Sequence, residues 1–307
     1  EFFHAWNVER IHPASLEPFD FEEANMSGAL WFAEGFTSYY TNLILARAGI
    51  ITAEEYVQGL SRTLNYVMLS PGQQFFNPIE MSYRAPFVDA ATAIDPDNNS
   101  NTFISYYSYG SLLGLALDVT LRTETSVNLD DYMRTLWSHY GKKEQPYSLK
   151  DLEATLAEMV GDSLAQSFFE HHIYDSQMPD MAEMLARVGV ELTQVAENEA
   201  YIGVSSRWSG DEEAWEIVSD PQIGSPAYLA GLNRGDMVHT LAGLGLSSER
   251  SIDEVVASKR VGQTVDVEFR RWGVPKEASV ILQANPRMQS SIMRRASREQ
   301  KDAMEAW

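Results

Sequence analysis

The feature that most constrains the fold is a change in residue pattern near position 195. Before it, long stretches such as residues 30–49, 53–69 and 102–122 have helical character. After it, short runs rich in Val, Ile, Phe and Trp are separated by Gly, Asp and Ser, which is typical of strands and turns. The sequence therefore predicts a multidomain α + β chain, with a mostly helical part over residues 1–192, a small β-rich domain over 193–286 and a polar tail over 287–307.

Local signals refine the helical part. The opening string EFFHAWNVER has helical character and must end near Pro13, because proline lacks the amide hydrogen that a helix needs. Gly49 is placed to close the helix of residues 30–49 in a left-handed conformation, and Thr52 with Glu55 forms a capping box for the next helix. The tail after residue 287 is polar enough to be either a loose helix or disordered.

Charge and composition exclude several functions. The chain has 23 Lys and Arg against 44 Asp and Glu, a formal net charge of −21, which argues against nucleic-acid binding. No apolar run reaches the length of a membrane span. There are no cysteines, so any transition-metal site must use histidine and carboxylate ligands.

The opening string carries the strongest chemical signal. EFFH becomes H-E-x-x-H if a histidine precedes residue 1, and in that motif two histidines one helical turn apart hold one zinc ion. His4 would then be a metal ligand, and Glu1 would be the general base that takes a proton from water. The first histidine is expected just before residue 1, which makes the given chain the C-terminal part of a longer protein.

A catalytic zinc site normally has a third protein ligand, and Glu34 is the candidate. It lies in LWFAEGFTSYY, where Trp31, Phe32 and Phe36 surround it in the sequence. Burying a carboxylate among apolar residues costs free energy unless it is paired or bound to a metal. The alternative is an exposed glutamate on an amphipathic helix.

Several separate strings together resemble one known family. EFFHAWNVERIHP, LWFAEGFTSYY, ARAGI and YYSYGSLLGLALD are similar to the glycyl aminopeptidases, which are thermolysin-like zinc metallopeptidases with a C-terminal PDZ domain. The resemblance runs from residue 1 to about residue 285. It implies that His4 and Glu34 bind zinc, that Glu1 is the base, and that residues 1–192 are the helical part of the catalytic domain.

The resemblance also implies an oxyanion donor. Related aminopeptidases have a Tyr-x-x-Gly string that opens a helix, and Tyr107 has this spacing to Gly110. The alternative is that all three tyrosines of YYSYG are core or rim residues. One departure is Ser38, which stands one turn after Glu34 where such enzymes often have an acid that orients a histidine ligand. Either a backbone carbonyl substitutes for that acid, or the imidazole is less strongly polarised.

The β-rich domain resembles a PDZ domain. The string YIGV, formed by Tyr201, Ile202, Gly203 and Val204, has the apolar-Gly-apolar form of the loop that captures a peptide C-terminus. The string GSPAYLAGLNRGDMVHTLAG resembles the helix, turn and strand of PDZ domains in bacterial proteases. The alternative is a packing domain with no free peptide site.

Two functional hypotheses follow. In the first, the parent protein is a zinc-dependent aminopeptidase that removes small N-terminal residues such as Gly or Ala, a preference that rests on the resemblance alone, and the given fragment lacks a zinc ligand and is inactive. In the second, the chain is a non-catalytic scaffold that binds peptides through the PDZ domain. A histidine encoded just before Glu1 favours the first. The resemblance implies a bacterial protein, and the compartment, cytoplasm or periplasm, stays open.

Overall fold

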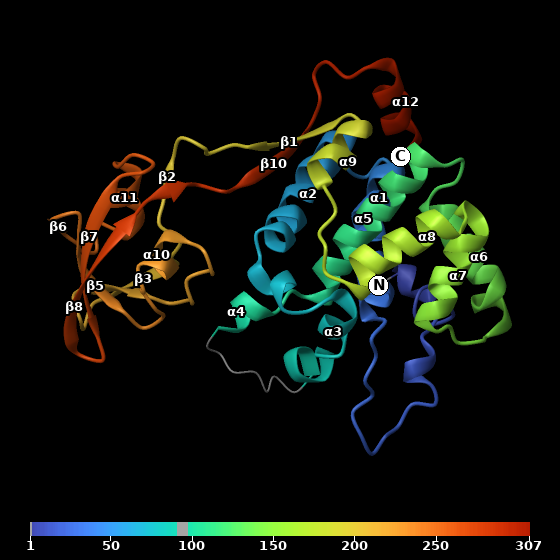
Figure 1. Ribbon diagram of the computed structural model, residues 1–307, viewed down its shortest axis with the longest axis horizontal. Coiled ribbons are helices and arrows are strands. Elements are labelled where there is room, and N and C mark those ends of the chain that lie inside the picture. Colours follow the sequence, from blue (N-terminus) through green and yellow to red (C-terminus); the bar gives the residue numbers. More distant parts are fainter. Residues whose placement is uncertain (1, 91–97) are drawn as a thin grey trace. The chain divides into compact units, whose positions relative to one another are not determined.

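The computed structural model describes residues 2–90 and 98–307, and these form two compact units (Figure 1). The first contains the described residues of Glu1–Ile94 together with Thr102–Thr193 and Gln289–Trp307. The second contains the described residues of Asp95–Asn101 and Gln194–Met288. The chain is thus mixed α/β, with a helical N-terminal region and a C-terminal sheet region.

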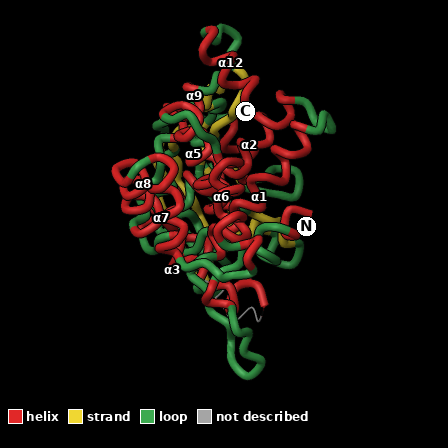
Figure 2. The backbone as a smooth tube through the Cα atoms, turned by 90° about the vertical axis from the view of Figure 1, so that its right-hand side faces the viewer, coloured by secondary structure: helices red, strands yellow, loops and turns green. Residues whose placement is uncertain are grey.

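The first unit is built almost entirely of helices, drawn in red in Figure 2. Its longer helices are α1 (Leu30–Arg47), α2 (Ala53–Met68), α5 (Tyr106–Glu124), α6 (Leu129–His139), α7 (Leu149–Val160), α8 (Asp162–Phe169), α9 (Met181–Arg187) and α12 (Arg298–Ala306). Shorter turns connect them: η1 (Phe2–Ala5), η2 (Ala14–Leu16), η3 (Pro71–Gln74), α3 (Pro78–Ser82), η4 (Pro86–Ala90), η5 (Gly141–Lys143) and η6 (Glu170–Tyr174). Among the described residues, no helix combines the length and apolar character that crossing a membrane requires.

The helix signals in α1, α2 and α5 are confirmed. α1 ends at Arg47 and Gly49 follows with φ of 69°, the left-handed conformation predicted for it. Thr52 and Glu55 form the predicted capping box at the start of α2, each side chain accepting a backbone N–H of the other residue. α5 is buried along most of its length, as its continuous apolar sequence predicts.

The core of the first unit is centred on α1 and α5, which pack at very short distance. Gly35 of α1 and Gly110 of α5 face each other at the crossing. A Cβ atom built on Gly110 would lie 1.8 Å from the carbonyl oxygen of Trp31, and one built on Gly35 would lie 2.4 Å from the Cα of Gly110. Only glycine at both positions permits this approach.

The N-terminal string does not form the helix that the sequence predicts. Phe2–Ala5 make one 3₁₀ turn, η1, and the chain then bends so that Val8, with φ of 103°, donates its N–H to Ile11 O. The cause is Asn7, whose side-chain amide donates to α1 rather than to its own segment. Tertiary contacts therefore override local helical propensity here.

The tail of the chain folds back onto the first unit. β1 (Val190–Gln194) pairs with β10 (Met288–Ile292), and α12 follows (Figure 1). Trp307 is only 7% exposed and joins the core that contains α1 and α5. The polar sequence predicted a loose helix or disorder, but it did not indicate that its last tryptophan would be buried.

The second unit is a small sheet domain with two short helices. Its six-stranded sheet has the order β3-β4-β5-β7-β8, with β6 paired to β5, and β2 pairs separately with β9. The strands are β2 (Ala200–Tyr201), β3 (Ser206–Ser209), β4 (Ala214–Ile217), β5 (Met237–Leu241), β6 (Leu244–Gly245), β7 (Thr264–Arg271), β8 (Val274–Ile281) and β9 (Gln283–Ala284). The helix α10 (Pro226–Leu229) lies in the string for which the sequence predicts a helix, α11 spans Ile252–Ala257, and the short α4 (Asn99–Thr102) precedes α5.

Candidate active site

His4 and Glu34 lie side by side although 29 residues separate them in the chain. His4 Nε2 is 3.3 Å from Glu34 Oε2, and the two side chains are 25% and 20% exposed. The other ring nitrogen of His4, Nδ1, is 3.0 Å from the main-chain oxygen of Asn7. A proton on Nδ1 satisfies that oxygen, so the lone pair of Nε2 is directed at the Glu34 side.

Asn7 fixes the turn that carries His4 to helix α1. It is fully buried, and its Nδ2 donates to Ala33 O at 2.9 Å and to Thr37 Oγ1 at 3.2 Å. Both acceptors flank Glu34 on α1. The sequence did not decide whether Asn7 is structural or lines a cleft; its contacts make it the residue that holds His4 in register with Glu34.

Tyr107 borders the same site from the first turn of α5. Burial, followed by the nearby Glu34 carboxylate and Asp89, raises the pKa of Tyr107, and Glu34 and Tyr107 also share a side-chain hydrogen bond. Its neighbour Tyr106 donates a hydrogen bond to Asp89, and burial together with that bond raises the pKa of Tyr106. Both phenols are therefore protonated at neutral pH and able to donate a proton in a hydrogen bond.

The close crossing of α1 and α5 explains why Glu34 and Tyr107 meet. Glu34 directly precedes Gly35, and Tyr107 stands one helical turn before Gly110, the glycine that Gly35 faces. With no side chain at either glycine, the two helices approach closely enough for a carboxylate and a phenol on their facing sides to touch. The glycine in AEGF and the glycine in YYSYG are the sequence signals of this approach.

His4, Glu34 and Tyr107 are thus brought together, whereas Glu1 lies outside the described residues. Ser38, one turn after Glu34, is not a partner of His4; the carbonyl of Asn7 has that place. Sequence reasoning missed Asp89, which lies within η4, two residues after Phe87.

The His4 and Glu34 pair fits two ligands of a zinc ion. Ligands about 2.0–2.1 Å from a tetrahedral zinc lie about 3.3 Å from each other, and Zn²⁺ accepts both imidazole nitrogen and carboxylate oxygen. The observed separation of the two atoms, 3.3 Å, matches this spacing. Within residues 2–90 and 98–307, no group of three or more His, Cys, Asp or Glu could hold a metal ion.

The predicted PDZ loop lines a groove of its own in the second unit. A cavity of about 400 Å³ runs between the loop and helix α11. Its walls include Tyr201, Ile202, Gly203 and Val204 on one side and Asp253, Val256 and Ala257 on the other. Burial raises the pKa of Tyr201, which is consistent with its place in the wall. The four loop residues therefore share one surface.

Comparison with known proteins finds a family model that matches the first part of the helical region. A family model described as M61 glycyl aminopeptidase matches residues 1–113, the stretch that contains His4, Glu34 and Tyr107. Over residues 1–113 the chain is thus similar to the M61 glycyl aminopeptidase family. The M61 match ends three residues after Gly110, so it includes both glycines of the α1–α5 crossing.

Solved structures extend the likeness beyond the M61 region. The crystal structure of an aminopeptidase N family protein from Idiomarina loihiensis is similar over 100% of this chain and 53% of that chain, with 24% identity and a TM-score of 0.84. At this identity the likeness shows the fold. The chain thus spans about half the length of that structure.

Other matches are more distant. The structure of the HtrA-type protease AlgWS227A with decapeptide matches over 29% of this chain and 30% of that chain, with 20% identity and a TM-score of 0.28. A serine endoprotease from Yersinia pestis covers 29% and 30%, with 21% identity and a TM-score of 0.25. Neither TM-score supports an argument about fold. No curated protein matches the chain at a significant level.

Proposed function

We propose that the protein to which this chain belongs is a zinc-dependent aminopeptidase that removes small N-terminal residues, such as Gly or Ala, from peptides. The observation that carries the proposal is the convergence of His4, Glu34 and Tyr107, which come from three separate parts of the sequence. The match of residues 1–113 to a peptidase family model supports it. The preference for small residues rests on the family resemblance.

The residues divide the chemistry among them. His4 Nε2 and the Glu34 carboxylate would hold zinc, with a third ligand from the histidine that we expect directly before Glu1. When bound, zinc supplies Lewis-acid polarisation of the substrate carbonyl and lowers the pKa of water. The main-chain oxygen of Asn7 keeps the imidazole oriented by accepting a hydrogen bond from the His4 Nδ1–H group.

Glu1 and Tyr107 would handle charge and protons during hydrolysis. Glu1 accepts a proton from the attacking water and passes it to the leaving amine. Tyr107 donates a hydrogen bond to the carbonyl oxygen as negative charge develops on it. Its raised pKa keeps the phenol protonated, so the donor is in place at neutral pH.

Replacing Tyr107 with phenylalanine tests this assignment. Loss of one oxyanion donor lowers kcat by about 10²–10³-fold and changes KM little, because the bond is made in the transition state. The measurement is steady-state hydrolysis of Gly- and Ala-anilides by the intact, zinc-loaded protein. The zinc content of each variant is measured as well, so that a loss of bound metal can be distinguished from a loss of catalysis.

Tyr109→Phe is the matched control. Tyr109 lies half a turn further along the same helix, and its hydroxyl is buried with no hydrogen-bond partner among the described residues. Its removal is expected to leave kcat within about twofold, because no donor is lost. Equal effects of the two substitutions would reject Tyr107 as the donor, and full activity after Glu1→Gln would reject the mechanism.

The groove in the second unit favours a second activity, peptide binding by a PDZ-like domain. The loop residues Tyr201–Val204 and helix α11 line one cavity of about 400 Å³. Backbone N–H groups of such a loop can bind a peptide C-terminus while apolar walls hold its last side chain. We propose this groove as a docking site in addition to the peptidase site.

An Ala257→Trp substitution tests the docking site. Ala257 is exposed and lines the groove, so an indole there would fill it and weaken binding of a fluorescent peptide library with free C-termini at least tenfold. Ser258→Trp is the control, because Ser258 is the exposed neighbour that does not line the groove. Binding that is unchanged in Ala257→Trp, as measured by fluorescence anisotropy, would reject the site.

A further inference from the structure

A cavity of about 130 Å³ lies between helices α1, α2 and α5, next to the candidate active site. Tyr107 is one of its lining residues. Ser38, one helical turn after Glu34 and on the same face of α1, is another. Tyr107 also shares a hydrogen bond with Glu34, so this residue belongs both to the candidate site and to the lining of the cavity.

The lining of this cavity selects by charge and size. The lining residues with polar groups carry hydroxyls or an amide: Ser38, Tyr39, Asn42, Tyr56, Thr63, Tyr107, Ser108 and Ser111. None of the lining residues among the described part of the chain is charged, so a charged side chain would lose water without gaining a partner. A cavity of about 150 Å³ admits a benzene molecule, so one slightly smaller suits a side chain up to the size of valine or threonine.

The inner wall of the cavity depends on the last residue of the sequence. Tyr39 and Tyr56 both line it, and both are buried. Trp307 Nε1 donates to Tyr39 Oη at 2.9 Å, and the Trp307 ring packs edge-on against Tyr56 with 5.4 Å between centroids. The two tyrosines are therefore held from behind by one indole.

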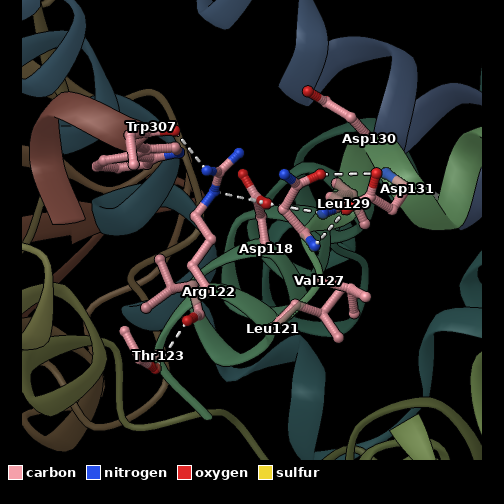
Figure 3. A network of polar contacts seen from close by, with 12 residues as sticks. Asp118, Leu121, Arg122, Thr123, Val127, Leu129, Asp130, Asp131 and Trp307 are labelled. Atoms are coloured by element: carbon pink, nitrogen blue, oxygen red, sulfur yellow. Dashed lines mark hydrogen bonds and ion pairs between the residues drawn. The ribbon is translucent and has the colours of Figure 1, made fainter. Parts of the chain in front are cut away.

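Two guanidinium groups hold Trp307 in place. Arg47 Nε donates to Trp307 O at 2.9 Å, and Arg122 donates to Ala306 O at 2.6 Å. Figure 3 shows Arg122 and Trp307. Arg122 also binds Asp118, the buried carboxylate to which Tyr39 donates its own proton at 2.7 Å. Trp307 is thus tied to α1 and α5, the two helices that carry Glu34 and Tyr107.

We propose that this cavity is the subsite for a small uncharged substrate side chain next to the scissile bond, and that Trp307 is the positioning residue for its inner wall. The proposal rests on the peptidase function proposed above. It names the cavity that would select substrates by the size and charge of a side chain. It also assigns a role to Trp307, in the segment that follows the second unit in the sequence.

The first test reduces the volume of the cavity by enlarging one of its lining side chains. Ser111→Leu places an isobutyl group among the hydroxyls, and hydrolysis is measured on peptide amides in which the residue on either side of the scissile bond is Gly, Ala, Thr or Lys. At one of the two positions, kcat/KM for Ala and Thr is expected to fall at least tenfold while kcat/KM for Gly stays within about twofold. A Lys substrate is expected to be poor in both proteins.

The control for this substitution is Ser138→Leu, an exposed serine on α6 that does not line the cavity. It should leave all substrates unchanged. An equal loss for Gly and Thr substrates in Ser111→Leu, or no loss at all, would overturn the subsite even if the wild-type protein is an active peptidase.

The second test does not depend on hydrolysis. The chain has seven tryptophans, so in 5-fluorotryptophan-labelled protein the ¹⁹F resonance of Trp307 is identified as the one missing in Trp307→Phe. Threonine amide is expected to shift this resonance saturably, and lysine amide and Ser111→Leu protein should show no shift. A Trp307 resonance that does not respond to threonine amide would overturn the proposal, whereas a response without any hydrolysis would retain the subsite and reject the peptidase.

Trp307→Phe separates positioning from mere stability. It keeps an aromatic ring against Tyr56 but removes the hydrogen bond to Tyr39. The expected result is a change in side-chain preference, with kcat/KM for Leu relative to Ala raised at least fivefold as the wall becomes mobile. A uniform change for all substrates would mean that Trp307 only stabilises the fold.

Discussion

Gly110→Ala is expected to lower the free energy of unfolding of the first unit by about 3 kcal/mol or more, the upper end of the overpacking range. The reason is that its Cβ would lie 1.8 Å from the carbonyl oxygen of Trp31, a backbone atom that no side-chain rotation can move away. Helices α1 and α5 must separate to relieve the contact. Glu34 and Tyr107 lie next to this crossing, so the proposed peptidase activity is expected to fall together with stability.

The measurement is thermal unfolding of the first unit, followed by near-UV circular dichroism. About 3 kcal/mol corresponds to a drop in Tm of roughly 6–12 °C for a unit of this size. Gly59→Ala is the control, since Gly59 lies in α2 with no atom within 4 Å of its built Cβ. It should raise stability by about 0.8–1 kcal/mol through helix propensity. A Gly110→Ala protein as stable as the wild type would contradict the close helix crossing.

Asp118→Asn is expected to cost about 3–5 kcal/mol, because it removes the charge that compensates a buried guanidinium. The Asp118 and Arg122 side chains are 1% and 8% exposed, and Asp118 Oδ1 accepts from Arg122 Nε at 2.9 Å and from the Leu129 N–H at 3.0 Å (Figure 3). Asparagine keeps the size of the side chain but leaves Arg122 as an unpaired buried charge.

The test is urea-induced unfolding together with hydrogen exchange of the α5 amides. The control is Asp131→Asn, whose partner Arg134 is 70% exposed, so a change of about 0–1 kcal/mol is expected. The double substitution Asp118→Asn with Arg122→Met should recover much of the loss, since it removes the unpaired charge. Equal stability of the Asp118→Asn and Asp131→Asn proteins would show that the buried pair contributes no more than an exposed one.

Much of the candidate site could be predicted from the sequence because its signals are local. Three patterns can be recognised in the sequence without a structure. They are a histidine three residues after a glutamate, a carboxylate among aromatic residues, and a tyrosine three residues before a glycine. The geometry of the first string could not be predicted, because the fold of EFFHAWNVER depends on Asn7. That side chain donates hydrogen bonds to acceptors on α1, 26 and 30 residues further along the sequence. These contacts are incompatible with a regular helix over the whole string.

The tail shows the same limit in another place. Residues 287–307 are polar, and polar residues that pack against distant elements leave no periodic pattern to read. Trp307 is buried because the end of the chain makes hydrogen bonds with Arg47, Arg122 and Tyr39, which lie on helices far away in the sequence. Such long-range partners become visible only when the chain is folded.

The sequence by itself determined the helical and β-rich halves, the caps of the helices and the residue types that a zinc peptidase needs, since these depend on neighbours within one or two turns. The tertiary structure decided which of those residues meet. Gly35 and Gly110 let two helices approach until Glu34 reaches Tyr107, and Asn7 holds His4 against the same helix. The physical reason is that contacts between distant segments depend on packing distance, which no single stretch of sequence encodes.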